Sequence, residues 1–465
     1  MLSDVRKAAE NTPPQRDRYI DLLRAVAITM VVLGHWLVVA VTYDEADGLS
    51  GFSALVAVPW SHPLTWLFQV MPLFFLVGGY ANGASLLAHR RSGGDVAGWL
   101  ITRSARLLGP TTVFLVTLTA SALLARLLGT DPQLVGTAVW LASIPLWFLT
   151  AYVAVLVLTP VLYPLHQRVG MIVPVVLVTA VAAADAARFL LGLPYAAANY
   201  LLVWLAVYQV GFVWRDGRLT DRRQPAQVVT AGSLLALVLL TAVGPYPVSM
   251  VAVPGEPVQN TAPPTLALLA LAATQIGLAL LLRRRADRWL SRRRPWFMVV
   301  AVNSVVLTVF LWHMAALVLA AVALYPRGLM AQPPVGSADW FLWRLPWLAC
   351  LLLMLTVLVA VFGRAERRSR RAHGDAVHRD IPRGGKLARL VLTYAGLAMV
   401  LVGLFGITTA GRADHGPLGL PGEALLAYLL GTVILWLIPL RRPRRPFSAP
   451  PGSRGGRGAQ GRRHW

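Results

Sequence analysis

The chain has little charge and almost no lysine or cysteine. Charged residues make up 14% of its 465 residues, and hydrophobic residues make up 57%. The single cysteine, Cys350, lies in an apolar run and excludes an intrachain disulfide. The scarcity of charge leaves several apolar runs longer than about 18 residues, the length that spans a bilayer. This composition excludes a water-soluble globular domain and predicts a polytopic membrane protein.

The apolar runs predict an all-α, polytopic transmembrane helix bundle of about 12 helices. The first 18 residues are polar, and the apolar run behind them is too long for a signal peptide, so we expect it to remain as a membrane helix. The runs lie near residues 20–42, 64–87, 107–128, 139–163, 171–192, 199–213, 227–246, 265–282, 296–324, 340–363, 388–410 and 423–440.

The basic residues predict the orientation of this bundle. The chain has 43 Lys and Arg against 20 Asp and Glu, a net charge of +23. With a cytoplasmic N-terminus and twelve helices, nearly all of them fall on the cytoplasmic side, and the exceptions are Arg126, Arg188, Arg327, Arg344 and Arg412. This bias follows the positive-inside rule and predicts that both termini are cytoplasmic. Because the charges lie in loops beside membrane helices, they favour anionic membrane lipids, and not nucleic acid, as a partner.

The first predicted helix carries ionisable residues at membrane depth. Arg24 and His35 are eleven residues, or about three turns, apart, so they lie on nearly the same face, and Asp21 joins that face. Ionisable residues inside a membrane usually face a protein interior or a water-filled cavity, which makes each a functional candidate. Two alternatives stay open: Arg24 could snorkel to the lipid headgroups, and His35 could form an interhelical hydrogen bond.

Further candidates lie in the third and ninth predicted helices. WLITRSARLLGP places Arg103 and Arg106 on one helix face, where two guanidinium groups suit phosphate, although such a pair also serves as a topology signal. His313 lies about as deep as His35 and is a candidate for the same site, with an interhelical hydrogen bond as the alternative. The histidines of the basic loop, His373 and His378, have no convincing ligand spacing, so we expect no metal site.

Five segments, in order, resemble those of membrane-bound acyltransferase family 3. DLLRAVAITMVVLGH is similar to the family's first-helix signature of an arginine and a later histidine, matched by Arg24 and His35. RSAR resembles the family's paired arginines at Arg103 and Arg106. MPLFFLVGGYANG, LWFLTAYVAVLVLTP and NSVVLTVFLWHM resemble its second-helix, mid-chain and late-helix segments, so the resemblance covers about residues 16–364.

This resemblance implies transfer of an acyl group, most often acetyl, from cytoplasmic acyl-CoA to a hydroxyl of a glycan or lipid-linked acceptor. Arg24, Arg103 and Arg106 would then bind the phosphates of the acyl-CoA donor. His35 suits a general base because imidazole titrates near neutral pH, with an acyl-imidazole intermediate as the open alternative. Asp21 and His313 are second-site candidates. Because arginine nearly replaces lysine, as in GC-rich genomes, we expect a bacterial cytoplasmic membrane as the location.

The chain departs from the family pattern in three respects. Gly78 stands where a serine is common, and the segment after Trp147 lacks the glutamate of many relatives. Two extra helices follow the first ten. We therefore divide the chain into a cytoplasmic segment (1–18), a ten-helix acyltransferase-like domain (19–364), a basic cytoplasmic loop (365–387), two additional transmembrane helices (388–440) and a disordered basic cytoplasmic tail (441–465).

A twelve-helix secondary transporter is the alternative from another functional class. The helix count and the intramembrane histidine and arginine fit proton-coupled transport. Two features argue against it. The loop HRRSGGDVAGWL lacks the Gly-x-x-x-Asp-Arg pattern of the major facilitator superfamily, and the basic loop divides the helices into ten and two instead of equal halves.

Overall fold

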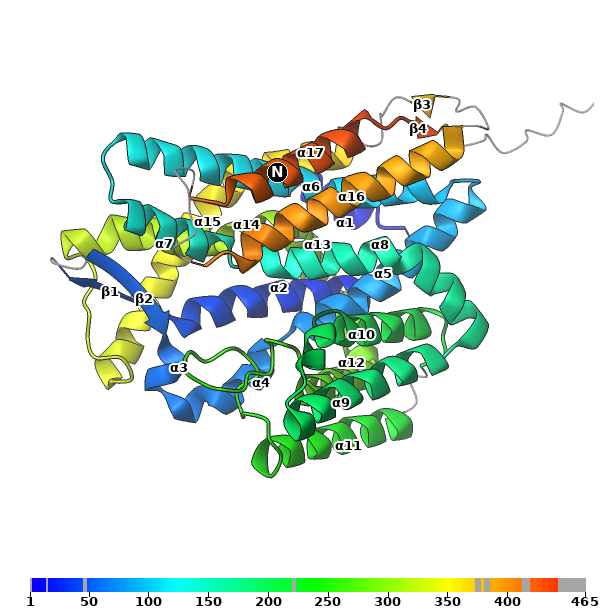
Figure 1. The fold of residues 1–465 in the computed structure, drawn as a ribbon, viewed down its shortest axis with the longest axis horizontal. Helices are drawn as coiled ribbons and strands as arrows, with labels where there is room; N and C mark the ends of the chain where they lie inside the picture. Colours follow the sequence, from blue (N-terminus) through cyan, green and yellow to red (C-terminus); the bar gives the residue numbers. More distant parts are fainter. Residues whose placement is uncertain are drawn as a thin grey trace, which may run out of the picture.

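In the computed structural model, long helices lie side by side along one direction, and a short strand hairpin stands at one end of the bundle (Figure 1). The structure describes residues 2–13, 16–44, 48–219, 223–372, 378–379, 385–411 and 419–441. Within these ranges, 11 helices are long and apolar enough to cross a membrane, and a further apolar helix, α17 (Gly422–Leu437), is shorter. The predicted all-α polytopic bundle is confirmed, and the chain is a multi-pass integral membrane protein.

The elements follow one another as α1 (Leu2–Glu10), α2 (Arg18–Val38), β1 (Val39–Asp44), β2 (Gly48–Ser53), α3 (Ala54–Ala57), η1 (Pro59–Leu64), α4 (Thr65–Phe68), α5 (Met71–Arg91), α6 (Val96–Leu127), α7 (Pro132–Ser143), α8 (Leu146–Val169), α9 (Ile172–Leu191), η2 (Pro194–Ala198) and α10 (Asn199–Arg215). They continue as α11 (Arg223–Ala242), α12 (Leu266–Leu290), α13 (Arg293–Ser304), α14 (Val306–Leu324), η3 (Tyr325–Arg327), α15 (Ala338–Ala372), β3 (His378–Arg379), α16 (Gly385–Thr409), α17 and β4 (Leu440–Arg441).

Each predicted apolar run overlaps a helix, but several boundaries were wrong. In the run 20–42 the helix ends at Val38. The residues after it form strand β1, which pairs antiparallel with β2. The β-branched residues after Val38 favour an extended strand there. The helix predicted at 107–128, α6, begins earlier, at Val96. The side chain of Asp95 caps it there by accepting a hydrogen bond from the backbone N–H of Gly98.

The predicted helix 296–324 is broken into α13 and α14 at Val305. The carboxylate of Glu366, on α15, accepts hydrogen bonds from the backbone N–H of Thr308 (2.8 Å) and from its hydroxyl (2.6 Å). Glu366 is only 1% exposed. A buried carboxylate at this position accepts a hydrogen bond from a free backbone N–H in the first turn of the new helix. Its negative charge also interacts favourably with the positive end of the helix dipole. It therefore fixes where α14, the helix that carries His313, begins.

The first part of the predicted basic loop (365–387) is helical, because α15 continues as far as Ala372. Residues 373–377 and 380–384 of that loop, with His373, lie outside the described residues, as does the predicted tail beyond residue 441.

The helices α16 and α17 pack closely against each other: a Cβ at Gly431 would lie 2.6 Å from the carbonyl oxygen of Gly396. Arg389 of α16, 4% exposed, forms an ion pair with Asp95 at the start of α6. The extra helix pair is thereby tied to the rest of the bundle.

Two glycines set the close approach of α5 and α10. A Cβ atom at Gly79 would lie 2.0 Å from the carbonyl oxygen of Tyr208, and one at Gly211 would lie 2.3 Å from that of Leu76. Small residues at such crossings let two membrane helices pack backbone against backbone. The helix α5 carries residues of the candidate site, so this contact also positions the site.

We expect Gly79→Ala to lower the thermal stability of the protein, because the added methyl must push α10 away, at a cost of about 1–3 kcal/mol. The melting temperature in nanodiscs measures this effect. Gly232→Ala is the matched control, since a Cβ there meets nothing within 4 Å. Equal melting temperatures for the two variants would contradict the close contact.

Candidate functional site

The structure brings the two intramembrane histidines into direct contact. His35 lies in the last turn of α2, and His313 lies in α14. Nδ1 of His35 is 2.8 Å from Nε2 of His313, and the ring planes are 12° from parallel with centroids 5.1 Å apart. The two residues therefore lie at one position in the bundle, and they form the interhelical hydrogen bond that was given as the alternative.

The hydrogen bonds around this pair determine which nitrogen carries each proton. Nδ1 of His313 is 2.6 Å from the carbonyl oxygen of Phe310. A carbonyl oxygen only accepts, so Nδ1 of His313 donates, and in the neutral ring Nε2 is then the acceptor. Nδ1 of His35 must therefore donate to it. This leaves Nε2 of His35 without a proton, with its lone pair available to a substrate.

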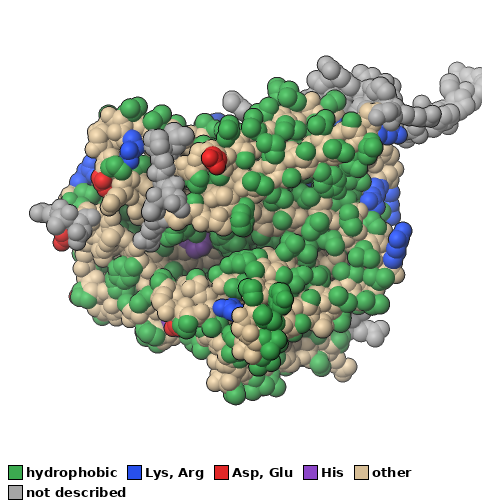
Figure 2. Space-filling model, in the orientation of Figure 1, with side chains coloured by type: hydrophobic (Ala, Val, Ile, Leu, Met, Phe, Trp, Pro, Cys, Tyr) green, Lys and Arg blue, Asp and Glu red, His purple; other side chains and the backbone are tan. Residues whose placement is uncertain are grey.

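The two histidines differ in their access to a ligand. His313 is fully buried, at 0% exposure, and His35 is half-buried. Figure 2 shows a hollow in one face of the bundle, with a histidine side chain at its floor. The backbone of His313 is held by the indole N–H of Trp36, which donates to its carbonyl oxygen at 3.0 Å. His35 is therefore the more accessible member of the pair, and His313 is the buried member to which it is hydrogen-bonded.

Aromatic rings surround the buried side of the pair. The ring of Phe310 lies 6.1 Å from that of His313 and 5.2 Å from that of Phe148, which packs in turn on Phe75 at 5.5 Å. These rings come from α14, α8 and α5. An apolar wall of this kind excludes water, which protects a reactive ester or thioester from hydrolysis.

Arg24 and Asp21 meet at the other end of the same helix face. Nη1 of Arg24 lies 3.0 Å from Oδ1 of Asp21, and Nε of Arg16 lies 2.6 Å from Oδ2 of the same carboxylate. Asp21 is 5% exposed. Two arginines share one carboxylate, so the cluster keeps a net positive charge. Asp21 thus lies beside Arg24 and far from His35, because eleven residues of helix separate Arg24 and His35 by about 16 Å.

Arg103 is held by a network of neutral side chains. Its Nε donates to Oδ1 of Asn82 at 2.6 Å, and Nδ2 of Asn82 donates to the hydroxyls of Tyr208 (2.8 Å) and Tyr152 (3.3 Å). Among the described residues no carboxylate forms an ion pair with Arg103. Arg24 and Arg103 interact electrostatically with each other and with Tyr152. Arg24 of α2 and Arg103 of α6 therefore lie close enough to interact.

Arg106 lies one turn further along α6 and is exposed, whereas Arg103 is half-buried. The sequence places both at the entrance of the third helix, but α6 begins at Val96, so both lie inside the helix. At 1.5 Å per residue, Arg103 lies about 10 Å from the helix start. Within the described residues there is no group of three or more His, Cys, Asp or Glu side chains that could hold a metal ion.

The structure gives a physical reason for the unusual glycine at position 78. A Cβ atom there would lie 2.7 Å from Cε2 of Tyr152, on α8. Tyr152 lies in the mid-chain segment where a glutamate is absent. The missing side chain on α5 thus accommodates the tyrosine ring of α8 beside Asn82.

Sequence reasoning missed Asn82, Tyr208 and Trp36 as parts of the site. Asn82 was the one with a readable signal, because it is an uncharged polar residue within an apolar membrane helix and must find a partner there. Tyr208 and Trp36 gave no such signal. Aromatic residues are common in membrane helices, and their partners come from elements far away in the chain.

The fold and the paired imidazoles define a membrane-embedded helical protein with an intramembrane histidine site. The sequence model of acyltransferase family 3, described as an acyltransferase domain, matches residues 17–364. The chain belongs to this family, and the resemblance seen in its motifs is confirmed. No curated protein and no solved structure matches the chain. Family membership supports acyl transfer as the activity and favours it over secondary transport.

Proposed function

We propose that this protein transfers an acyl group, most often acetyl, from cytoplasmic acyl-CoA to a hydroxyl of a glycan or lipid-linked acceptor, with His35 as general base. The observation that carries the proposal is the hydrogen-bond chain from the carbonyl of Phe310 through His313 to His35. It leaves Nε2 of His35 as an unprotonated nitrogen on a half-buried ring, which is what a general base requires.

The proposed reaction proceeds in two stages. Nε2 of His35 takes the proton of the acceptor hydroxyl while that oxygen forms a bond to the thioester carbonyl carbon. The tetrahedral intermediate then collapses, the carbon–sulfur bond breaks, and the proton on Nε2 passes to the leaving thiolate. Throughout, Nδ1–H of His35 donates to His313, which holds the ring in one orientation and stabilises its charged form.

The positive cluster supports an anionic donor on the same side as the N-terminus. Coenzyme A carries several phosphates, and arginine binds phosphate bidentately without losing its charge. Arg103 has no carboxylate partner within the described residues, and Arg24 shares Asp21 with Arg16. We propose that the nucleotide stays at this cluster while the thin thioester arm follows the α2 face for about 16 Å toward His35.

Release of free CoA from acetyl-CoA by the purified protein in lipid nanodiscs tests the donor assignment. Wild-type protein is expected to release CoA slowly by hydrolysis even without acceptor, and faster when its acceptor is present. Saturable binding of acetyl-CoA should accompany the release. Folded protein that neither binds acetyl-CoA nor releases CoA would overturn the donor assignment.

The role of His313 predicts a graded series of variants. His313→Phe keeps a ring in the buried site but removes the acceptor for Nδ1–H of His35, and we expect kcat to fall about 10²-fold with KM for acetyl-CoA unchanged. His313→Gln is expected to recover part of that loss, because its amide oxygen accepts the same hydrogen bond. Equal rates for the two variants would mean that His313 acts by packing alone.

A further inference from the structure

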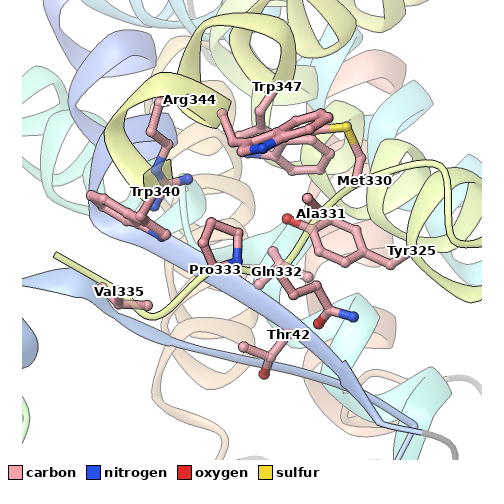
Figure 3. Close-up of a pocket in the computed structure, with 12 residues that line it drawn as sticks. Thr42, Tyr325, Met330, Ala331, Gln332, Pro333, Val335, Trp340, Arg344 and Trp347 are labelled. Carbon is pink, nitrogen blue, oxygen red and sulfur yellow. The ribbon is translucent and has the colours of Figure 1, made fainter. Parts of the chain in front are cut away.

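A small cavity lies at the end of the bundle that carries the strand hairpin, away from the arginine cluster. It is enclosed by β1, by the segment after η3 and by the first turns of α15, and it measures about 30 Å³. Figure 3 shows Trp340 and Arg344 on one side of this pocket and Tyr325 and Trp347 on another, with Gln332 near the strand. The family's motifs include none of these residues.

Arg344 is a buried cation with no anionic partner in the part of the chain that the structure describes. It is 7% exposed, and its guanidinium group lies 4.0 Å above the ring of Trp340. Its terminal nitrogens donate to the carbonyl oxygens of Val39 (3.1 Å) and Leu37 (3.4 Å), at the end of α2. Among the described residues it forms no ion pair, and its buried Nε–H has no hydrogen-bond partner. The hydrogen bonds to the end of α2 engage the terminal nitrogens of Arg344 but leave its Nε–H without an acceptor.

Trp347 supplies a second unpartnered donor to the same pocket. It is 2% exposed, and its buried indole N–H has no hydrogen-bond partner within the described ranges. Arg344 and Trp347 are three residues apart on α15, so they share one helix face. A tryptophan that merely anchors a helix at the membrane surface keeps its N–H in water, and each buried donor without an acceptor costs about 1–3 kcal/mol. Two such donors beside a positive charge suit an acceptor that carries negative charge.

We propose that this pocket binds the oxyanion of an acidic saccharide. The cavity admits about two water-sized groups, since each needs about 10–15 Å³ of such space, so a carboxylate or phosphate oxygen enters and the sugar ring stays at the opening. Trp343, which lines the pocket and is 40% exposed, offers an aromatic face for the ring. Gln332 and Thr42 add polar groups at the strand side.

The position of the pocket makes it an acceptor subsite, an assignment that rests on the proposed function. Arg344 binds the carbonyl oxygen of Leu37, two residues beyond His35 on the same helix. A saccharide anchored by its oxyanion at Arg344 therefore lies beside the end of α2 that carries His35. Under the predicted topology this is the outer face of the membrane, opposite the donor cluster. Donor and acceptor then approach His35 from opposite ends of α2.

Calorimetric titration of the protein in nanodiscs, without acyl-CoA, tests the pocket directly. The probes are D-glucuronate, D-glucose 1-phosphate and D-glucose, which separate a carboxylate from a phosphate and both from a neutral sugar. We expect at least one anionic sugar to bind at least tenfold more tightly than glucose. Trp347→Phe, which keeps a ring and removes the N–H, should weaken that binding about tenfold. Trp436→Phe, at a tryptophan that is 82% exposed on α17, should leave it unchanged.

Three results would overturn the pocket assignment: no binding of either anionic sugar, equal binding of all three sugars, or equal binding by the two tryptophan variants. Arg344→Lys provides a second test, because it keeps the charge but removes Nε–H, and it should also weaken the anionic sugar. The titration uses no donor, so CoA release without saccharide binding rejects the pocket alone. Saccharide binding without CoA release rejects the proposed donor and leaves the pocket standing.

Discussion

His35→Ala is expected to lower the rate of acyl transfer about 10³-fold, the contribution of a positioned general base. The loss should fall on kcat, with KM for acetyl-CoA nearly unchanged, because the arginine cluster lies about 16 Å away along α2. Free CoA released over time, at saturating acetyl-CoA in nanodiscs, measures it. Raising the acetyl-CoA concentration should not restore the lost activity.

His62→Ala is the matched control for this variant. His62 lies in η1 and contacts the carbonyl oxygen of Leu55 through Nε2 at 3.0 Å, away from the histidine pair. Its kinetics should equal those of the wild type. A folded His35→Ala variant with wild-type kcat would remove the general base from the account and leave the histidine pair as an interhelical contact.

Arg103→Ala is expected to raise KM for acetyl-CoA by about 10- to 100-fold, since hydrogen bonds to charged groups contribute about 1.5–3 kcal/mol each. The effect on kcat should be small, because in the proposed site Arg103 binds the donor's phosphates and does not contact the reacting atoms. Arg103→Lys should give an intermediate KM, because lysine keeps the charge but loses the fork that binds phosphate bidentately. Initial rates over a range of acetyl-CoA concentrations provide both constants.

The control for Arg103 lies on the same helix. Arg126 is in the last turn of α6, at the opposite end from Arg103. Arg126→Ala removes the same charge from the same helix and should leave KM unchanged. If both variants raise KM equally, the effect is one of overall charge, and the donor site does not include Arg103.

The helix bundle was predictable because a bilayer imposes one length on every apolar run. Within the described residues, 11 helices are long and apolar enough to cross a membrane for that reason, and the twelfth run forms the shorter α17. The helix periodicity also placed Arg24, Asp21 and His35 correctly on one face of α2. Boundaries were less predictable where a distant residue sets them. Glu366 caps α14 from 58 positions away, and no local pattern around Val305 shows that contact.

The candidate site was predictable only in its charged and titratable members. An arginine or histidine inside a membrane helix stands out because its burial is costly. The direct contact between His35 and His313 required the packing of α2 against α14, which spacing along the chain does not determine. The tautomer of His35 depends on a backbone carbonyl, that of Phe310, and a carbonyl carries no sequence signal. In the sequence, Arg344 was only an exception to the positive-inside rule. Its burial and its hydrogen-bond partners, which suggest a binding pocket, are visible only in the structure.

The central claim is that an acyl-CoA donor reaches His35 from the end of the bundle that carries Arg24 and Arg103. The most direct test measures CoA release from acetyl-CoA added to one side of sealed proteoliposomes. Acetyl-CoA does not cross the bilayer, and protease cleavage of an N-terminal tag reports how much protein faces outward. External acetyl-CoA should yield free CoA in proportion to the protein whose N-terminus faces outward, and His35→Ala should abolish that release. Release in proportion to the opposite orientation, or equal release by His35→Ala, would contradict the account.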